Sequence, residues 1–201
     1  MILEGHPEGH PPRRQQILEA LARELETSPG DRITTARPAA VVGVSEAALY
    51  RHFASKAKMF EALIAFAEDS VFSLVTRILA EEPDPKARCD RVLRLVLGFS
   101  ERNPGITRVL LGDALVGEHE RLQQRSVQFF NRIETQVKQV LREAEAATGR
   151  RWPAPVPAVA GLLVAVVEGR LVQFARSRFQ RSPLETWDDQ WRVLSTALFP
   201  P

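Results

Sequence analysis

Residues 42–60 read VGVSEAALYRHFASKAKMF and bring together side chains that suit contact with a polyanion. Tyr50, Arg51 and His52 follow one another, and two lysines come a few residues later. Side chains of these types reach the phosphates or the base edges of a nucleic acid, and small residues between them allow a close approach. The alternative is an exposed helix face that binds nothing.

The charge and size of the chain set limits on these two interpretations. The 201 residues are 44% hydrophobic and carry a formal net charge of +2. This length allows one large domain, or a small unit and a larger one, with a sizeable core. The net charge is too small to indicate nucleic acid, although basic residues cluster between Arg32 and Lys58. Such clusters are also common on solvated surfaces, so charge alone does not decide.

The composition predicts a cytoplasmic protein. The longest apolar runs fall short of the ~20 residues that a membrane helix needs, so we expect no membrane span. Residues 1–12 have neither the basic nor the apolar region of a signal peptide, and their Pro, Gly and His content predicts a flexible tail. Cys89 is the single cysteine, which excludes an internal disulfide and a cysteine-rich zinc site.

The elements that must position the polar side chains are helical by their periodicity. Apolar residues at helical spacing predict a first helix that starts at Arg13 and ends at the TSPGD segment. A second, short helix begins after Thr34 or Thr35, either of which can cap it. Gly43 is placed to take the left-handed conformation that ends this helix.

A third helix follows at once and completes a recognisable unit. Ser45 is predicted to cap it, and it extends to about His52. Two short helices joined by a glycine-containing turn form a helix-turn-helix, whose second helix can enter the major groove of DNA. The residues with the spacing of the inward face are Ala40, Val44, Leu49 and Phe53.

The start of the fourth helix carries charges of the unfavourable sign. Ser55 is predicted to cap this helix, and Lys56 and Lys58 lie in its first turn. Cations at this end oppose the helix dipole and cost a few tenths of a kcal/mol. A bound phosphate would be favoured by the free N–H groups and by the lysines together. The cationic first turn therefore favours DNA as the partner.

The segment ITTARPAAVVGVSEAALYRHFASKAKMF, residues 33–60, resembles the DNA-binding domain of the TetR family of regulators. The shared features are the threonine cap, the Gly-Val-Ser turn, the Leu-Tyr-x-His-Phe run and the Ser-Lys start of the fourth helix. The resemblance implies an all-α, TetR-like homodimer. In such a protein a helix-turn-helix domain would cover residues 13–54, and a helical dimerisation and partner-binding domain would cover residues 55–201.

The likeness extends to the branch of this family that comprises nucleoid occlusion factors. The stretches RITTA, LGFSERNPGITRVL and QVKQVLREAE all resemble that branch. The resemblance implies a dimer that, when bound to DNA, binds the C-terminal tail of the division protein FtsZ and blocks septum assembly over the chromosome. It also implies a nucleoid-associated protein.

Three features depart from the pattern of the branch. Pro38 stands where an apolar residue is usual, and Ala54 stands where proline is usual. The first of these is compatible with a helix because it lies in the first turn, where no intrahelical N–H bond is lost. The tail before Arg13 is less basic, which predicts weaker nonspecific DNA binding.

A set of DNA-binding residues follows from the helix-turn-helix pattern and the resemblance. A two-fold dimer also predicts a double-stranded, pseudo-palindromic operator. The residues are Arg13, Thr34, Thr35, Ser45, Glu46, Ala47, Tyr50, Arg51, His52, Lys56 and Lys58.

A second surface is predicted on the fourth and fifth helices. Phe66 falls outside the expected buried stripe of its helix, while Leu95, Gly98 and Arg102 align on one face of the next. A mid-helix glycine costs ~1 kcal/mol, which usually marks a close approach of another backbone. These residues could form a groove for an apolar peptide with acidic groups, or Gly98 could merely admit a neighbouring helix. The resemblance favours the partner-binding surface and adds Asn103 to it.

The last third of the chain is predicted to carry the dimer interface. Gly161, Ala165 and Gly169 recur every fourth residue on one helix, which lets another helix approach closely, and Trp187 and Trp191 share one face of the final helix. Two helices from each chain would then form a four-helix interface. Core packing within one chain is the alternative.

Other functions fit the sequence less well. None of the four histidines has metal-ligand spacing, and no phosphate-binding loop or nucleophile elbow occurs, so we expect no catalytic residue, metal or cofactor. The main alternative is a ligand-responsive transcriptional repressor of the TetR family, with a small-molecule pocket among its C-terminal helices. Such a repressor would leave DNA when a ligand binds, whereas a division factor would bind the FtsZ tail more strongly on DNA.

Overall fold

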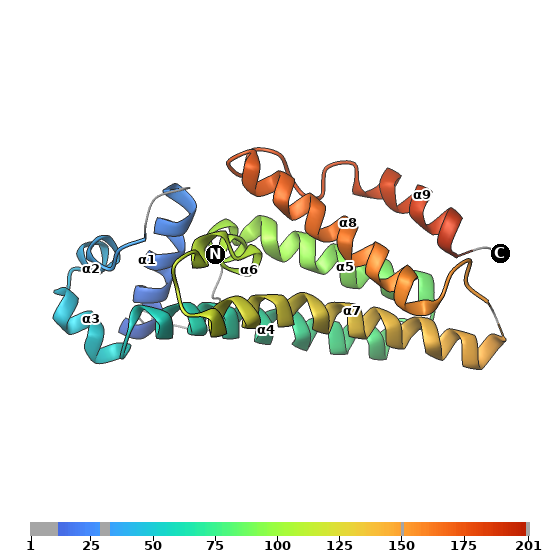
Figure 1. The fold of residues 1–201 in the computed structure, drawn as a ribbon, viewed down its shortest axis with the longest axis horizontal. Coiled ribbons are helices and arrows are strands. Elements are labelled where there is room, and N and C mark those ends of the chain that lie inside the picture. The colour runs from blue at the N-terminus through green and yellow to red at the C-terminus, as the bar shows by residue number, and fades with distance from the viewer. Residues whose placement is uncertain (1–11, 29–32, 150, 200–201) are drawn as a thin grey trace. The chain divides into compact units, whose positions relative to one another are not determined.

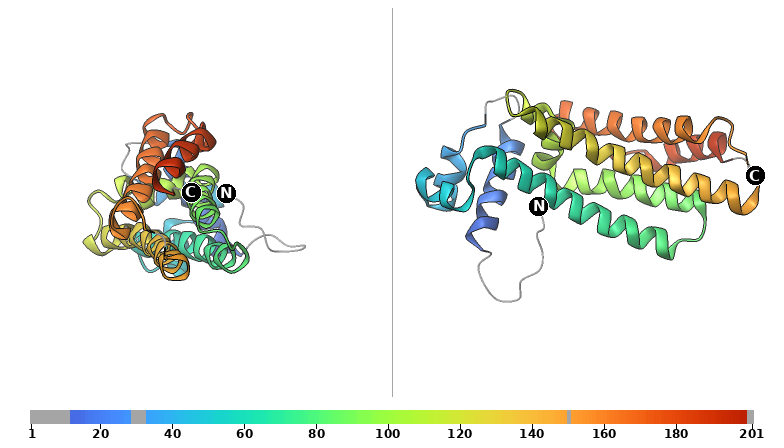
Figure 2. Two further views of the ribbon diagram at one scale, coloured as in Figure 1. Left: turned by 90° about the vertical axis from the view of Figure 1, so that its right-hand side faces the viewer. Right: turned by 60° about the horizontal axis from the view of Figure 1, so that its bottom comes forward.

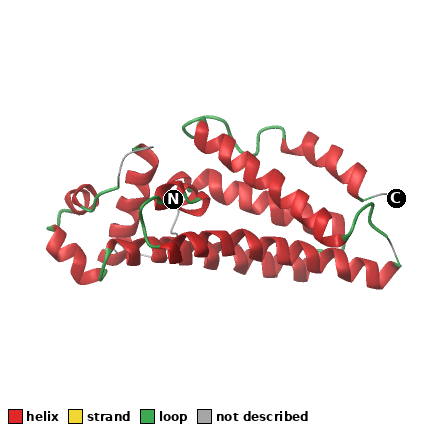
Figure 3. Cartoon of the chain, in the orientation of Figure 1, coloured by secondary structure: helices red, strands yellow, loops and turns green. Residues whose placement is uncertain are grey.

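The structure is a computed structural model that describes residues 12–28, 33–149 and 151–199. Every regular element in these ranges is a helix, as Figures 1 and 3 show. The prediction of an all-α fold is therefore confirmed. The predicted tail lies outside the described residues except for Pro12, and Arg32 of the basic cluster lies outside them as well.

The chain folds into two compact units, each made of separate segments. The first comprises residues 1–68 and 102–126, and the second comprises residues 69–101 and 127–201. The helix-turn-helix segment belongs wholly to the first unit, while the predicted boundary after residue 54 stays a prediction. The helices are α1 (Arg13–Thr27), α2 (Ala36–Val42), α3 (Glu46–His52), α4 (Lys56–Glu81), α5 (Pro85–Arg102), α6 (Pro104–Leu111), η1 (Asp113–Leu115), α7 (Glu120–Thr148), α8 (Val156–Arg176) and α9 (Trp187–Leu198).

The turn between α2 and α3 has the predicted chemistry. Gly43 adopts the left-handed conformation, with φ of 72°, and its N–H donates to the carbonyl of Ala40. Ser45 then caps α3, because its hydroxyl oxygen accepts from the N–H of Ala48 at 3.1 Å. Both predictions are confirmed. The two short helices follow α1 in the blue part of the ribbon in Figures 1 and 2.

The inward face of the helix-turn-helix differs from the prediction at one position. Leu49 and Phe53 are buried as expected, and Val44 is half-buried. Ala40 is exposed, so its prediction as a core residue is wrong. Pro38 and Ala39 are buried instead. Because successive helical residues lie about 100° apart, a shift of one position moves the buried face off Ala40.

Helix α6 anchors α1 within the first unit. A Cβ atom at Gly105 would lie 1.9 Å from the carbonyl oxygen of Ala22, so only glycine allows these two backbones to meet. Arg108, which is buried, donates to the carbonyl oxygens of Leu25 and Ser28 at 2.7 and 3.1 Å. These bonds satisfy carbonyl groups at the end of α1 that have no partner within the helix. The first helix of the helix-turn-helix domain is thereby held by a helix far away in sequence.

Helix α5 has an aspartate cap and a buried apolar stripe. The Asp84 carboxylate accepts from the N–H of Ala87 at 2.8 Å, and Pro85 is the first residue of the helix. Burial raises the pKa of the Cys89 thiol to about 12, and the charge of Asp84 adds to the shift. This thiol is therefore a core group and not a nucleophile. The stripe of Cys89, Val92, Val96 and Phe99 is buried throughout.

Helix α8 differs from the expectation that no apolar segment is long enough to span a membrane. Its 21 residues are long and apolar enough to cross a membrane, by length and composition alone. The core helix of a globular protein passes the same test. Within α8, Arg170 is buried and donates to the carbonyl oxygens of Pro183 and Glu185 and to the side chain of Gln190. These bonds and the buried apolar residues of α8 pack one side of this helix into the second unit.

Candidate nucleic-acid interface

The outer face of α3 carries the DNA-binding residues that were predicted for this helix. Glu46, Ala47, Tyr50, Arg51 and His52 are all exposed, which confirms their outward position. Two of them are basic, and Ala47 is small enough to allow close approach to a groove. This face has the mixture of donors, acceptors and small side chains that direct readout of a major groove uses.

Thr35 has a different structural role from the predicted one. It stands at the N-terminal cap of α2, but its hydroxyl makes no capping bond, so the predicted cap is wrong. The hydroxyl donates instead to the carboxylate of Glu46 at 2.6 Å and lies 3.2 Å from the hydroxyl of Tyr50. Thr35 is buried, whereas Thr34 beside it is exposed. The buried threonine therefore links the start of α2 to the exposed face of α3.

Arginines at the start of α1 lie against the same region. The guanidinium of Arg13 donates to the carbonyl oxygen of Val42 at 3.1 Å, which ties α1 to the end of α2. Arg14, which sequence reasoning missed, stacks over the ring of Phe53 with its guanidinium carbon 4.6 Å from the ring centroid. Both arginines are exposed. Arg14 could have been predicted from the sequence, because it directly follows the predicted Arg13 in the RRQQ segment.

The two lysines at the start of α4 are paired with carboxylates. Ser55 caps the helix as predicted, since its hydroxyl accepts from the N–H of Lys58 at 3.2 Å. The Lys56 ammonium lies 2.6 Å from the carboxylate of Glu118, and that of Lys58 lies 2.8 Å from the carboxylate of Glu61. The hydrogen bond from Lys58 lowers the pKa of Glu61, more than burial raises it, and Arg121 adds to the shift.

These pairs give an intramolecular reason for the cationic first turn of α4. Contact of Lys56 and Lys58 with phosphate stays a prediction, because both ammonium groups are paired with carboxylates in this structure. Sequence reasoning missed Glu118 as a functional candidate because it lies 62 positions after Lys56, where no local pattern connects the two. Contact of Lys56 with DNA would require exchange of Glu118 for a phosphate.

The predicted partner-binding residues have contrasting exposure. Arg102 is exposed, whereas Gly98 and Asn103 are buried. Phe66 and Leu95 are half-buried, so Phe66 is not the fully exposed aromatic that its helical position suggested. Phe66, Arg102 and Asn103 belong to the first unit, and Leu95 and Gly98 to the second.

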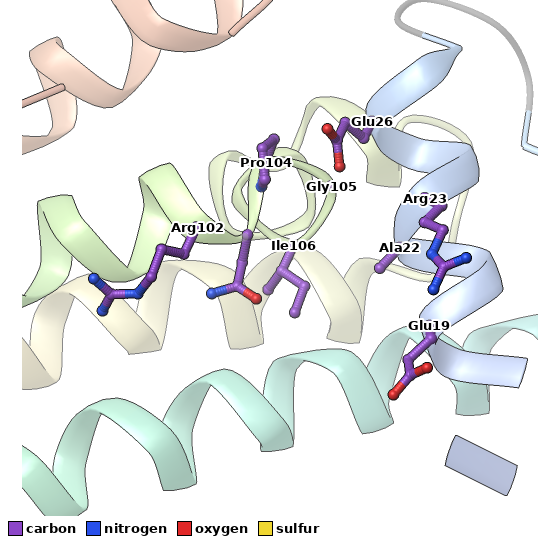
Figure 4. Close-up of a pocket in the computed structure, with 9 residues that line it drawn as sticks. Glu19, Ala22, Arg23, Glu26, Arg102, Pro104, Gly105 and Ile106 are labelled. Atoms are coloured by element: carbon purple, nitrogen blue, oxygen red, sulfur yellow. The ribbon is translucent and has the colours of Figure 1, made fainter. Parts of the chain in front are cut away.

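A small cavity of about 190 Å³ lies beside Arg102 in the first unit. Figure 4 shows it, with side chains of α1 on one side and the start of α6 on the other. Charged side chains of both signs line the cavity, which distinguishes it from the apolar pocket typical of a drug-sized ligand. The lining residues are Glu19, Ala22, Arg23, Glu26, Arg102, Asn103, Pro104, Gly105 and Ile106.

The tryptophans predicted for the dimer interface lie in the core of the second unit. The side chains of Trp187 and Trp191 are only 1% and 8% exposed, and their rings stack with centroids 6.1 Å apart. The indole N–H of Trp187 donates to the Asp90 carboxylate at 2.8 Å. Their role at a dimer interface stays a prediction, because their side chains are packed within one chain.

The small residues of α8 are arranged differently. Ala165 and Gly169 are exposed, and Gly161 is half-buried. A Cβ atom added at Gly161 or Gly169 would meet nothing within 4 Å. These glycines therefore serve no close contact within the described part of the chain. Leu162, on the same helix, leaves 48% of its surface exposed.

Comparison with protein families identifies both parts of the chain. Residues 17–63 match the model of bacterial regulatory proteins of the tetR family. Residues 84–199 match the model of the tetracycline repressor-like C-terminal domain in its SlmA-like form.

Known proteins resemble the chain along almost its whole length. The nucleoid occlusion factor SlmA of a Marinomonas species is 55% identical over 186 residues, which is 92% of this chain and 94% of that protein. The SlmA of Shewanella amazonensis is 54% identical over the same shares, and that of Idiomarina loihiensis is 52% identical.

Solved structures show the same fold at low identity. The MbdR regulator from Azoarcus superposes with a TM-score of 0.79 at 17% identity, over 94% of this chain and all of that one. The FadR regulator of Bacillus subtilis superposes with a TM-score of 0.71 at 13% identity, over 92% of this chain and 98% of that one. Given these matches and the helix-turn-helix geometry, the chain belongs to the TetR family of bacterial regulatory proteins, and within it to the family of the nucleoid occlusion factor SlmA.

Proposed function

We propose that this chain is a nucleoid occlusion factor that binds specific chromosomal DNA sites as a homodimer. On DNA it would bind the C-terminal tail of the division protein FtsZ and thereby block septum assembly over the chromosome. The observation that carries the proposal is the identity of 52–55% over about nine-tenths of the chain with proteins named for this activity. The protein would then be a cytoplasmic, nucleoid-associated regulator and not an enzyme.

The arrangement of the first unit supports the DNA-binding part of the proposal. A capped helix, α3, presents an exposed face with two basic residues, and Arg13 and Arg14 lie at the start of α1. A helix held in this way can place its side chains in a major groove, while arginines at its edge contact phosphates. The DNA-binding residues we propose are those predicted from the sequence together with Arg14. Ser45 and Thr35 would act mainly by fixing the position of α3.

The tail-binding part of the proposal centres on Arg102. Its guanidinium is exposed, and the neighbouring cavity gives a recess beside it. An exposed arginine next to a recess is suited to an acidic group on an extended peptide. Asn103 and Gly98 are buried, so they would shape the backbone around Arg102 and not present side chains to a partner.

A tail-peptide binding measurement tests this function directly. Fluorescence anisotropy of a labelled FtsZ tail peptide should rise with added protein, and cognate DNA should strengthen the binding. Arg102→Ala should weaken tail binding at least about tenfold, as loss of a charge-assisted hydrogen bond predicts, and leave operator affinity unchanged. Arg142→Ala, at an exposed arginine of α7, is the matched control. Tail binding that survives Arg102→Ala would refute the role of Arg102.

The same measurement separates this function from that of a ligand-responsive repressor. If cognate DNA leaves tail binding undetectable while small apolar ligands release the protein from DNA, the chain is a repressor. Sedimentation of the protein with a short operator duplex provides the second criterion, because a homodimer predicts two chains on one pseudo-palindromic site.

A further inference from the structure

The hydrogen bond between Thr35 and Glu46 has a fixed direction. A threonine hydroxyl carries one hydrogen, and a carboxylate can only accept. The Oγ1 atom of Thr35 lies 2.6 Å from Oε2 of Glu46, which is a short bond of the charge-assisted type. The single hydrogen of Thr35 therefore points to Glu46.

This direction determines the state of Tyr50. The hydroxyl oxygens of Thr35 and Tyr50 lie 3.2 Å apart, and geometry alone allows either to be the donor. With the hydrogen of Thr35 already given to Glu46, only Tyr50 can donate in this second contact. The phenolic hydrogen then points inward to Thr35, which is buried, and the outward side of the Tyr50 oxygen carries only lone pairs.

Glu46 and Tyr50 thus present acceptors alone on the exposed face of α3. Both residues are exposed, and the second carboxylate oxygen of Glu46 has no hydrogen to give. Acceptors repel phosphate oxygens, which are acceptors too. In a major groove, the donors on base edges are the exocyclic amino groups, N6 of adenine and N4 of cytosine.

We propose that Thr35 is a positioning residue for sequence recognition, which fixes Tyr50 as an acceptor so that Glu46 and Tyr50 select bases with an exocyclic amino group. The proposal rests on the DNA-binding role of α3 proposed above. It assigns a specificity role to the buried hydroxyl of Thr35, which acts through Tyr50.

The first test needs no DNA. Tyr50 is the only tyrosine of the chain, so the Raman tyrosine doublet reports on its hydroxyl alone. Wild-type protein should show the intensity ratio of a donating phenol. Thr35→Val should shift the ratio toward that of an accepting or solvated phenol, and Thr35→Ser should restore the wild-type value. An unchanged ratio in Thr35→Val would overturn the proposal.

The second test measures base selection. The wild-type protein is first used to select an operator from random duplex DNA. Each adenine of that operator is then replaced by purine, which lacks the N6 amino group, and each cytosine by its analogue without N4. At one position or more, removal of the amino group should weaken wild-type binding by roughly threefold to tenfold, the range for a single hydrogen bond. Tyr50→Phe should be insensitive to at least one of these replacements, and Thr35→Ser should behave as the wild type.

The outcomes separate this inference from the proposed function. If the wild-type protein selects no sequence, DNA recognition itself fails. If it selects an operator but tolerates removal of every amino group, or if Tyr50→Phe keeps the full wild-type sensitivity, DNA recognition stands and the acceptor role of Tyr50 is refuted. Thr35→Val should also accept guanine or thymine at the affected position, because its released phenol can donate outward.

Discussion

At the scale of single residues, the charges around α4 show that the availability of a basic side chain for DNA depends on its ion-pair partner. Lys56 and Glu118 form a pair whose side chains are 22% and 18% exposed. A pair of this kind contributes at most about 1 kcal/mol to stability at a protein surface. Its larger effect would be on DNA binding, because the Glu118 carboxylate competes with a phosphate for the Lys56 ammonium.

Replacement of Glu118 should therefore strengthen DNA binding. Glu118→Gln should raise operator affinity severalfold, and the plot of log affinity against log salt should steepen by about 0.9, the slope for one additional phosphate contact. Fluorescence anisotropy over a series of salt concentrations measures both quantities. In the Lys56→Ala background, Glu118→Gln should have no such effect.

A neighbouring glutamate separates this effect from net charge. Glu120 is exposed and accepts a hydrogen bond from Gln124. Glu120→Gln makes the same change of charge without releasing a lysine, so we expect it to leave affinity almost unchanged. Equal gains from the two substitutions would argue against competition between Glu118 and DNA for Lys56.

At the scale of elements, the contact between α1 and α6 joins segments that lie about eighty residues apart. Gly105 lets α6 meet the backbone of Ala22, and Arg108 binds the end of α1. This contact fixes α1 of the helix-turn-helix domain against α6. Because the atoms that meet belong to the backbone, a change of side-chain rotamer cannot relieve a clash there. The cavity beside Arg102 shares residues with this contact (Figure 4).

A methyl group at Gly105 should disrupt this element contact. Gly105→Ala places its Cβ atom 1.9 Å from the Ala22 carbonyl oxygen, so one helix must shift. We expect the free energy of unfolding to fall by about 1–3 kcal/mol, the usual cost of overpacking. Urea denaturation measures this change. Asn131→Ala, at an exposed position of α7, is the control, and loss of stability in both variants alike would contradict the assignment.

At the scale of the whole molecule, the proposed dimer assigns a purpose to the exposed small residues of α8. Gly161, Ala165 and Gly169 leave room along one helix that the described chain does not fill. Small residues at such spacing let a helix of a second copy approach closely. Trp187 and Trp191 of α9 are buried within the second unit, and their place in the dimer stays a prediction.

A bulky charge on α8 should therefore separate the dimer. Ala165→Arg should shift the protein toward monomer in sedimentation at micromolar concentration, and operator affinity should fall because one half-site alone is bound. Thr135→Arg, at an exposed position of α7, adds the same charge elsewhere and should leave the dimer intact. A dimer that tolerates Ala165→Arg would place the interface on another surface.

Local sequence signals determined much of the fold. Gly43 and the serine caps act on their own backbone neighbours within a few residues, so their roles could be predicted without tertiary contacts. The TetR-family assignment has the same basis, because its pattern of turn, caps and polar residues lies within 28 consecutive positions. Exposure of Tyr50 and its neighbours on α3 also followed from helical periodicity.

Only the tertiary structure decided which polar and aromatic side chains form ion pairs and hydrogen bonds within the chain. Glu118 reaches Lys56, and Trp187 reaches Asp90, across dozens of residues of sequence. Helical periodicity states which side of a helix a residue occupies, but it does not state what covers that side. Ion pairing and burial depend on distances between elements, and these distances are set by packing of the whole chain.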